Sequence, residues 1–234
     1  MNGRFIALSV SDALPADMIF ERISALNDLR SSCPHLNHIC VRNDSFDPEM
    51  FAAAVSMASA AGFGMVSESS DPVCLRAISQ ICPDAVLCPT DASILSEASM
   101  LSSIFGNPLA VPGVDVQDLM DNAESAASAG VSDIILNPTI MNMKSCLETN
   151  TDLSRLASEH DIPLAKNPVM TRSWSGEYAM SIASVSILRH GSIIVLDDLD
   201  PEGCRILDAL MDSCACGTLS DENRYRLSIP DSSR

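Results

Sequence analysis

Short apolar runs alternate with amphipathic stretches along the whole chain. Each run has the length of a β-strand, and the stretch after it has helical periodicity. Their spacing suits one strand plus one crossover helix. The predicted strands are FIALSV from Phe5, HICVRN from His38, FGMVSE from Phe63, AVLCPT from Ala85, LAVPG from Leu109, DIILNP from Asp133, PLAKNP from Pro163 and SIIVLDD from Ser192.

Eight strand–helix units in 234 residues predict a closed (β/α)8 TIM barrel, an α/β fold. A doubly wound sheet is less favoured, because no glycine-rich dinucleotide fingerprint follows an early strand. We expect one barrel domain over residues 1–216 and a polar C-terminal tail, 217–234, that packs loosely.

The predicted helices begin at aspartates. Asp47, Asp71 and Asp200 each precede a proline, which places an N-cap carboxylate before a proline at the first helical position. Asp91 and Asp115 are expected N-caps as well. These five carboxylates therefore have a structural explanation before any functional one.

Composition excludes several classes of protein. The formal net charge is −17, which argues against binding to nucleic acid or to an anionic membrane surface. No apolar stretch approaches the roughly 20 residues of a membrane-spanning helix, and no signal peptide is evident. The nine cysteines are an odd, scattered set that does not resemble a secreted disulfide framework, so we expect a reducing, cytoplasmic location.

Metal-binding patterns are sparse. Cys214 and Cys216 form the one close cysteine pair, and they lack further ligands nearby, so a structural role is favoured over metal binding. The four histidines are scattered without a zinc-binding spacing. We therefore expect no protein-built metal site.

Polar residues follow the predicted strands at their carboxyl ends, where barrel active sites lie. Amide and carboxylate groups there could pair with the donor–acceptor edge of a heterocycle such as a pterin, although the same residue types also cap helices and form turns. The candidate binding residues are Asn43, Asp44, Asn137, Lys166, Asn167 and Asp197.

Lys166 supports two interpretations. A desolvated lysine at the end of strand 7 could be a Schiff-base nucleophile. The favoured alternative is a salt bridge to Asp197 or Asp198 on the next strand.

The segment after predicted strand 7 carries the one tryptophan of the chain, Trp174. Arg172, with Ser173 and Ser175 at a helix N-terminus, could hold a phosphate or carboxylate. Alternatively, Trp174 and Tyr178 pack the barrel mouth while Arg172 pairs with Glu177. Both interpretations stay open.

Several segments, in order, resemble the barrel of the corrinoid iron–sulfur protein large subunit, the gamma subunit family of the acetyl-CoA decarbonylase/synthase complex. They are ALSVSD, LNHICVRNDSFDPEMFAAAV, DAVLCPTDASILSEASMLSSIFGNPLAV, GVSDIILNP and, in archaeal members, RSWSGEYAMSIASVSILRHGSIIVLDDLDP. The resemblance covers about residues 5–210 and implies a methyl-transfer role in one-carbon metabolism.

This sequence departs from that family. Within the printed sequence, no four-cysteine cluster motif precedes the barrel pattern and no corrinoid domain follows it, so we expect no cofactor to be bound by this chain alone. Asn137 stands where the family has an aspartate, so a role that needs a carboxylate there is not carried over.

Three functions follow from these observations. The first is a barrel that binds a methyltetrahydropterin, or the corrinoid (cobalamin) of a partner protein, at its C-terminal rim. The second is a non-catalytic scaffold that assembles with a corrinoid protein or a related barrel subunit. The third, an unrelated lysine-dependent lyase, depends on Lys166 alone.

Overall fold

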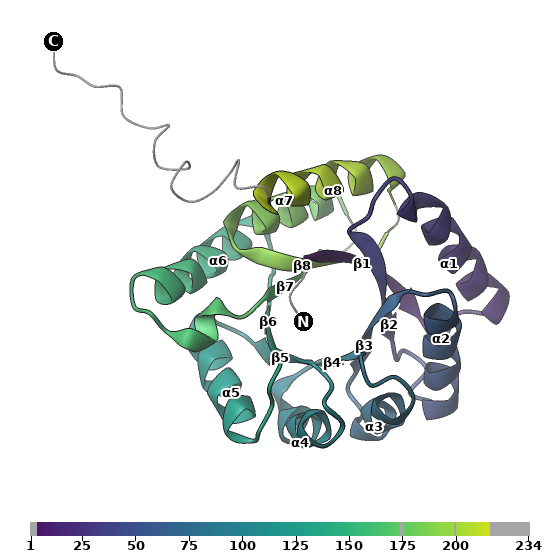
Figure 1. Ribbon diagram of the computed structural model, residues 1–234, viewed down its shortest axis with the longest axis horizontal. Coiled ribbons are helices and arrows are strands. Elements are labelled where there is room, and N and C mark those ends of the chain that lie inside the picture. The colour runs from purple at the N-terminus through teal and green to yellow at the C-terminus, as the bar shows by residue number, and fades with distance from the viewer. Residues whose placement is uncertain (1–3, 174–175, 199, 216–234) are drawn as a thin grey trace, which may run out of the picture.

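Eight parallel strands close into a barrel in the order of the sequence, and eight helices surround it (Figure 1). The structure is a computed structural model that describes residues 4–173, 176–198 and 200–215. The strands are β1 (Phe5–Ser11), β2 (Leu36–Arg42), β3 (Gly64–Ser69), β4 (Val86–Pro89), β5 (Leu109–Gly113), β6 (Ile134–Pro138), β7 (Val169–Ser173) and β8 (Gly191–Leu196). The TIM-barrel prediction is confirmed.

Each strand is followed by a helix on the outside of the barrel. The helices are α1 (Ala16–Arg30), α2 (Pro48–Ala60), α3 (Pro72–Ile81), α4 (Leu95–Phe105), α5 (Val116–Ser128), α6 (Met143–Ser158), α7 (Ala179–Arg189) and α8 (Pro201–Ala215). Two short 3-10 helices, Ala92–Ile94 and Pro163–Lys166, precede α4 and β7.

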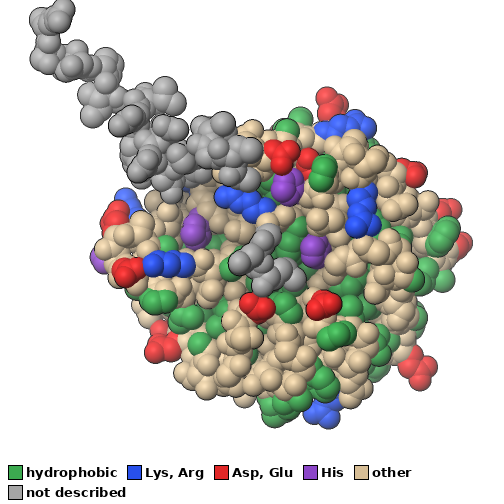
Figure 2. Space-filling view, viewed as in Figure 1, with side chains coloured by type: hydrophobic (Ala, Val, Ile, Leu, Met, Phe, Trp, Pro, Cys, Tyr) green, Lys and Arg blue, Asp and Glu red, His purple; other side chains and the backbone are tan. Residues whose placement is uncertain are grey.

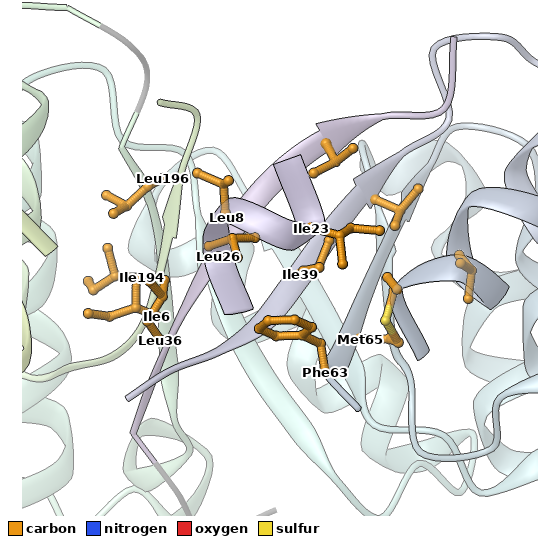
Figure 3. Close-up of a cluster of buried hydrophobic side chains, with 14 of the residues drawn as sticks. Ile6, Leu8, Ile23, Leu26, Leu36, Ile39, Phe63, Met65, Ile194 and Leu196 are labelled. Atoms are coloured by element: carbon orange, nitrogen blue, oxygen red, sulfur yellow. The ribbon is translucent and has the colours of Figure 1, made fainter. Parts of the chain in front are cut away.

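Alternation along the strands divides the core into two layers. One set of side chains fills the barrel interior, including Ala7, Val66 and Ile135. The opposite faces of the strands pack against the helices. Figure 3 shows part of this outer layer, where Ile6 and Leu8 of β1 lie against neighbouring strands and α1.

The predicted aspartate caps are present. The carboxylate of Asp47 accepts the backbone N–H of Glu49 at 2.8 Å, and Asp71 accepts from Val73 at the same distance. Asp115 caps α5 in the same way. Since each cap satisfies an N–H group that the first helical turn leaves unpaired, these aspartates belong to the scaffold.

The prediction for strand 7 is wrong. PLAKNP, beginning at Pro163, contains a 3-10 helix, and β7 is the following segment, Val169–Ser173. Pro163 has no N–H to give to a ladder and starts the helix, while Leu164 packs beneath it against the outer core. The apolar run that begins at Pro163 is therefore part of the connection between α6 and β7, and it is not a strand.

The turn from α7 into β8 is tight. A Cβ on Gly191 would lie 2.0 Å from Oγ of Ser186, so no larger residue fits there. The left-handed backbone conformation falls instead on His190, with φ of 138°. This places strain on a histidine at the end of the barrel where the strands begin.

The structure also bears on the predictions for the cysteines, for membrane-spanning helices and for the C-terminal tail. Eight cysteines are described and each is a free thiol. No helix within the described ranges is long and apolar enough to cross a membrane. The predicted tail, 217–234, and Cys216 lie outside the described residues. The thiol of Cys214 donates to the carbonyl oxygen of Ile187, with 3.8 Å between sulfur and oxygen.

Candidate functional site

A cavity of about 420 Å³ opens at the carboxyl ends of the strands. Most of its lining is apolar, and a few polar groups converge on it, as in many small-molecule sites. The lining residues are Cys40, Glu68, Cys88, Thr90, Pro112, Asn137, Pro138, Thr139, Ile140, Met141, Met170, Arg172 and Val195. The cavity lies where barrel enzymes have their active sites.

Arg172 of β7 occupies the centre of this mouth. One nitrogen of its guanidinium pairs with Glu68, and the other lies 3.1 Å from Asp197 and 2.9 Å from Oγ of Ser9. All three charged side chains are at most 15% exposed. Two carboxylates for one guanidinium leave this cluster with a net negative charge, so it disfavours an anionic ligand.

The electrostatic surroundings of the mouth shift several pKa values. Burial alone would lower the pKa of Arg172, but the carboxylates of Glu68 and Asp197 hold it above its ordinary value. Burial, together with Glu68, raises the pKa of the Cys40 and Cys88 thiols. Both cysteines are therefore neutral at physiological pH and act as small, polarisable wall residues.

Asn137 of β6 is the one amide side chain among the described residues that line the cavity. Its amide nitrogen donates to the sulfur of Cys88 at 3.6 Å, which is a weak interaction. Within the described part of the chain, no hydrogen bond reaches its carbonyl oxygen. Asn137 therefore has an acceptor, and part of its donor capacity, available to a ligand.

Asn43 follows β2 at the rim as expected, but it does not line the cavity. Its nitrogen donates to Asp12 at 2.9 Å, and its oxygen accepts from Ser69 at 2.9 Å. Asp12 also accepts from the backbone and the hydroxyl of Ser45. Both ends of the Asn43 amide are committed to fixing the loop after β2.

Asp44 lies in the same loop and pairs with Arg42 at 3.0 Å. The pair is partly exposed, so it contributes little to stability. Neither Asp44 nor Asp197 lines the cavity. Asp197 does pair with Arg172, which is a lining residue.

Lys166 and Asn167 do not lie at this rim. Because β7 begins after them, both stand at the opposite end of the barrel. Lys166 is more than half exposed and pairs with Asp161, instead of with Asp197 or Asp198. The favoured prediction of a salt bridge to Asp197 or Asp198 is therefore wrong. The alternative, a Schiff-base lysine inside the barrel mouth, is contradicted as well, and the lyase hypothesis loses its premise.

In the segment after β7, the structure contradicts the roles predicted from the sequence for Arg172, Ser173 and Glu177. Arg172 and Glu177 are both described, and no ion pair joins them; Glu177 is exposed. Ser173 is buried and donates to the carbonyl of Ala179. Since Arg172 is already neutralised, it offers no site for a phosphate. Trp174 lies outside the described residues.

The sequence prediction of the site missed Cys40 and Cys88 as cavity residues, and it did not select Glu68 as a binding residue although Glu68 ends a predicted strand. A signal was present, because Cys40 and Glu68 share the parity of interior positions on β2 and β3. Metal binding has no support among the described residues, where no group of three or more His, Cys, Asp or Glu side chains is close enough to hold an ion.

Exposed apolar side chains surround the mouth on the loops and helix starts that follow the strands. Phe46, Val114 and Met141 are 67%, 74% and 76% exposed, and Tyr178 is similarly exposed. Phe46 also has a left-handed φ of 55°, held by the loop that Asn43 fixes. We call Phe46, Val114, Met141 and Tyr178 the apolar rim.

Known proteins resemble this chain over most of its length. The acetyl-CoA decarbonylase/synthase complex subunit gamma 1 of Methanosarcina thermophila is 26% identical over 218 residues, covering 82% of this chain and 46% of the relative. The corrinoid/iron-sulfur protein large subunit of Moorella thermoacetica is 25% identical over 201 residues, covering 79% and 45%. The chain thus spans about half the length of these relatives.

Among solved structures, dihydropteroate synthase from Thermus thermophilus superposes with a TM-score of 0.69 at 13% identity, covering 91% of this chain and 94% of that chain. A truncated 3-deoxy-D-arabino-heptulosonate 7-phosphate synthase from Thermotoga maritima gives a TM-score of 0.64 at 15% identity, covering 93% and 89%. At these identities the likeness supports the barrel fold alone.

A family model described as "CO dehydrogenase/acetyl-CoA synthase delta subunit" matches residues 1–210. Together with the similarity to the gamma subunits and to the corrinoid/iron-sulfur large subunit, it confirms the resemblance found in the sequence. The chain therefore belongs to the CO dehydrogenase/acetyl-CoA synthase delta subunit family.

Proposed function

We propose that the mouth of this barrel binds the heterocycle of a methyltetrahydropterin in one-carbon metabolism of the acetyl-CoA decarbonylase/synthase type. The observation that carries the proposal is Asn137, an amide with uncommitted hydrogen-bonding capacity in a partly apolar cavity of about 420 Å³. The names of the relatives, which are acetyl-CoA decarbonylase/synthase and corrinoid/iron-sulfur subunits, are consistent with it.

The chemistry of the cavity suits a neutral, N–H-rich ring. A volume of this size lies within the range of small-molecule sites. Thioether and aliphatic walls from Met170 and Val195 would contact the ring faces, and Asn137 would pair with its polar edge. The negative charge of the Arg172 cluster would favour ring N–H donors over anionic groups.

Methyl transfer also needs a methyl acceptor. In this proposal the barrel orients the methylated ring, and a corrinoid carried by a partner subunit approaches the mouth to accept the methyl group. A hydrogen bond to the leaving nitrogen lowers the barrier to breaking its bond to the methyl carbon. The polar groups at the mouth would supply or orient that hydrogen bond in the cytoplasm, where we expect the protein to act.

Calorimetric titration with a reduced methylpterin tests the proposal. We expect saturable binding that weakens about tenfold in Asn137→Ala, the loss of roughly one good hydrogen bond. Asn167→Ala is the matched control, because it makes the same chemical change at the opposite end of the barrel. A flat trace with native protein, or an equal loss of affinity in both variants, would overturn the proposal.

A second candidate, docking of a corrinoid-bearing partner without pterin binding, is favoured by the apolar rim. Three of its four side chains are at least two-thirds exposed, so their apolar surface at the mouth is open to a partner. Under this function, native protein would form a complex with the purified corrinoid subunit in sedimentation experiments. Val114→Lys with Met141→Lys would abolish the complex, whereas Ile81→Lys with Ile104→Lys, at exposed positions near helix C-termini, would not.

A further inference from the structure

A second cleft, of about 260 Å³, lies at the other end of the barrel, where the strands begin. Arg4, Lys166, Arg189 and His190 line it, so four basic side chains face one small volume. Figure 2 views this end of the molecule, and lysine or arginine and histidine side chains gather around the barrel axis on it. None of the cavity residues of the mouth takes part.

This concentration of basic groups contrasts with the rest of the chain. The protein has 14 Lys and Arg against 31 Asp and Glu, and three of the 14 line this cleft. Lys166 is paired with Asp161, which is itself exposed. Within residues 4–173, 176–198 and 200–215, neither Arg4 nor Arg189 has a carboxylate partner.

Arg4 shows the imbalance most clearly. Its Nη1 atom is buried and has no hydrogen-bond partner in the part of the chain that the structure describes. A buried guanidinium nitrogen without an acceptor is costly, and native structures rarely leave one unexplained. An oxyanion in the adjacent cleft would supply the missing acceptor.

Three separate elements bring these groups together. Arg4 precedes β1, Lys166 ends the 3-10 helix before β7, and Arg189 ends α7. His190 follows in its left-handed conformation, and its Nε2 donates to the carbonyl of Ala165 at 3.2 Å. That bond links the turn before β8 to the 3-10 helix before β7, so the cleft walls are held in place before any ligand arrives.

We propose that this cleft binds a phosphate group, either as inorganic phosphate or as the phosphoryl end of a small phosphorylated molecule. Two guanidinium groups and an ammonium group match the charge of a phosphate, and guanidinium forks match its geometry. The amide of Asn167 adds an uncharged donor. The volume is below that of sites that enclose a whole cofactor, so one end of a ligand fits it better.

Isothermal titration at fixed ionic strength, with chloride as the balancing anion, tests this site. The probes are inorganic phosphate and glycerol phosphate. We expect saturable binding of one or both, weakened at least tenfold in Arg4→Gln/Arg189→Gln. The control, Arg76→Gln/Lys144→Gln, changes the net charge equally on exposed helix surfaces elsewhere and should bind as the native protein does.

The relative affinities for the two probes distinguish inorganic phosphate from a phosphorylated molecule as the ligand. Equal affinity for both probes supports inorganic phosphate as the ligand, and at least tenfold tighter binding of glycerol phosphate supports a phosphorylated molecule. If the double variant fails to fold by thermal unfolding, Lys166→Met replaces it, because Lys166 is more than half exposed. Absence of saturable binding by either probe, or undiminished binding by a folded cleft variant, would overturn the proposal.

Discussion

Glu68 of β3 and Arg172 of β7 form an ion pair across the mouth of the barrel, although 104 positions separate them in the chain. In a barrel of eight strands, β3 and β7 stand on opposite sides. The ion pair therefore spans the opening of the barrel, and both of its residues line the cavity.

Replacing Arg172 by Met should destabilise the fold. The change leaves Glu68 and Asp197 mostly buried without a cation, which costs about 3 kcal/mol in the free energy of unfolding. Urea denaturation measures the loss. Arg172→Met/Glu68→Met should recover part of it, because the stranded carboxylate is removed. A loss below about 1 kcal/mol for Arg172→Met would contradict the assigned role.

His38 predicts a specific pH dependence of stability. Burial, aided by Arg30, lowers the pKa of His38 from 6.5 to about 4. Between these values the unfolded chain binds a proton that the folded chain does not, so stability falls as the pH drops from 6.5 towards 4. The loss from this group is about 3 kcal/mol.

His38→Phe isolates that contribution. The His38 ring stacks on Phe5 with centroids 3.6 Å apart, so a phenyl ring preserves the contact. Native protein should lose about 3 kcal/mol more than the variant between about pH 7 and pH 4, measured by urea denaturation at each pH. Parallel stability curves for the two proteins would exclude the assignment.

Asn107 should be sensitive to the loss of its amide. Its buried nitrogen donates to the carbonyls of Cys82, Pro83 and Ala85 at 2.9–3.0 Å, which ties the start of β5 to the connection before β4. Asn107→Ala should reduce the free energy of unfolding by about 1–3 kcal/mol. Asn107→Asp should cost more, because a carboxylate would face three carbonyl oxygens.

The control for that experiment is Asn122→Ala, which removes a single bond to the carbonyl of Pro112. Its cost should be about 1 kcal/mol and smaller than that of Asn107→Ala. Thermal or urea unfolding ranks the three variants. Equal costs for both alanine variants would show that the triple contact adds nothing.

The buried thiols should resist disulfide exchange with a thiol reagent in the folded protein. Burial raises the pKa of Cys74, Cys146 and Cys204 to about 11, so almost no thiolate is present at about pH 8. Ellman's reagent should therefore leave these three unmodified in native protein, whereas all nine cysteines should react in denaturant. Mass spectrometry of partly labelled peptides identifies the sites, and rapid native labelling of Cys146 would contradict its assigned burial.

Seven of the eight strands follow from local pattern, because a buried parallel strand needs an apolar run and its helix needs a cap. Strand β7 escapes this rule. Its sequence, VMTRS, places Arg172 inside the barrel, where the ion pair with Glu68 compensates its burial. That compensation comes from a distant strand, so no local pattern could reveal it.

The candidate site was predictable to a similar extent. Parity along β6 puts Asn137 at the mouth once the strand is known. The fate of Asn43 was not predictable, because its partners, Asp12 and Ser69, come from other strands. The local sequence around a polar residue after a strand does not show whether its side chain binds a ligand or hydrogen-bonds to a neighbouring loop.

The apolar filling of the barrel has a consequence for how its two ends communicate. Buried side chains such as Val66, Val86 and Ala110 fill the barrel interior between the mouth and the basic cleft. These buried side chains lie between the two clefts, so molecules bound at the two ends would not compete for space. Substitutions at Asn137 and at Arg4 should then have additive effects on free energy, each end behaving as an independent compartment of the same domain.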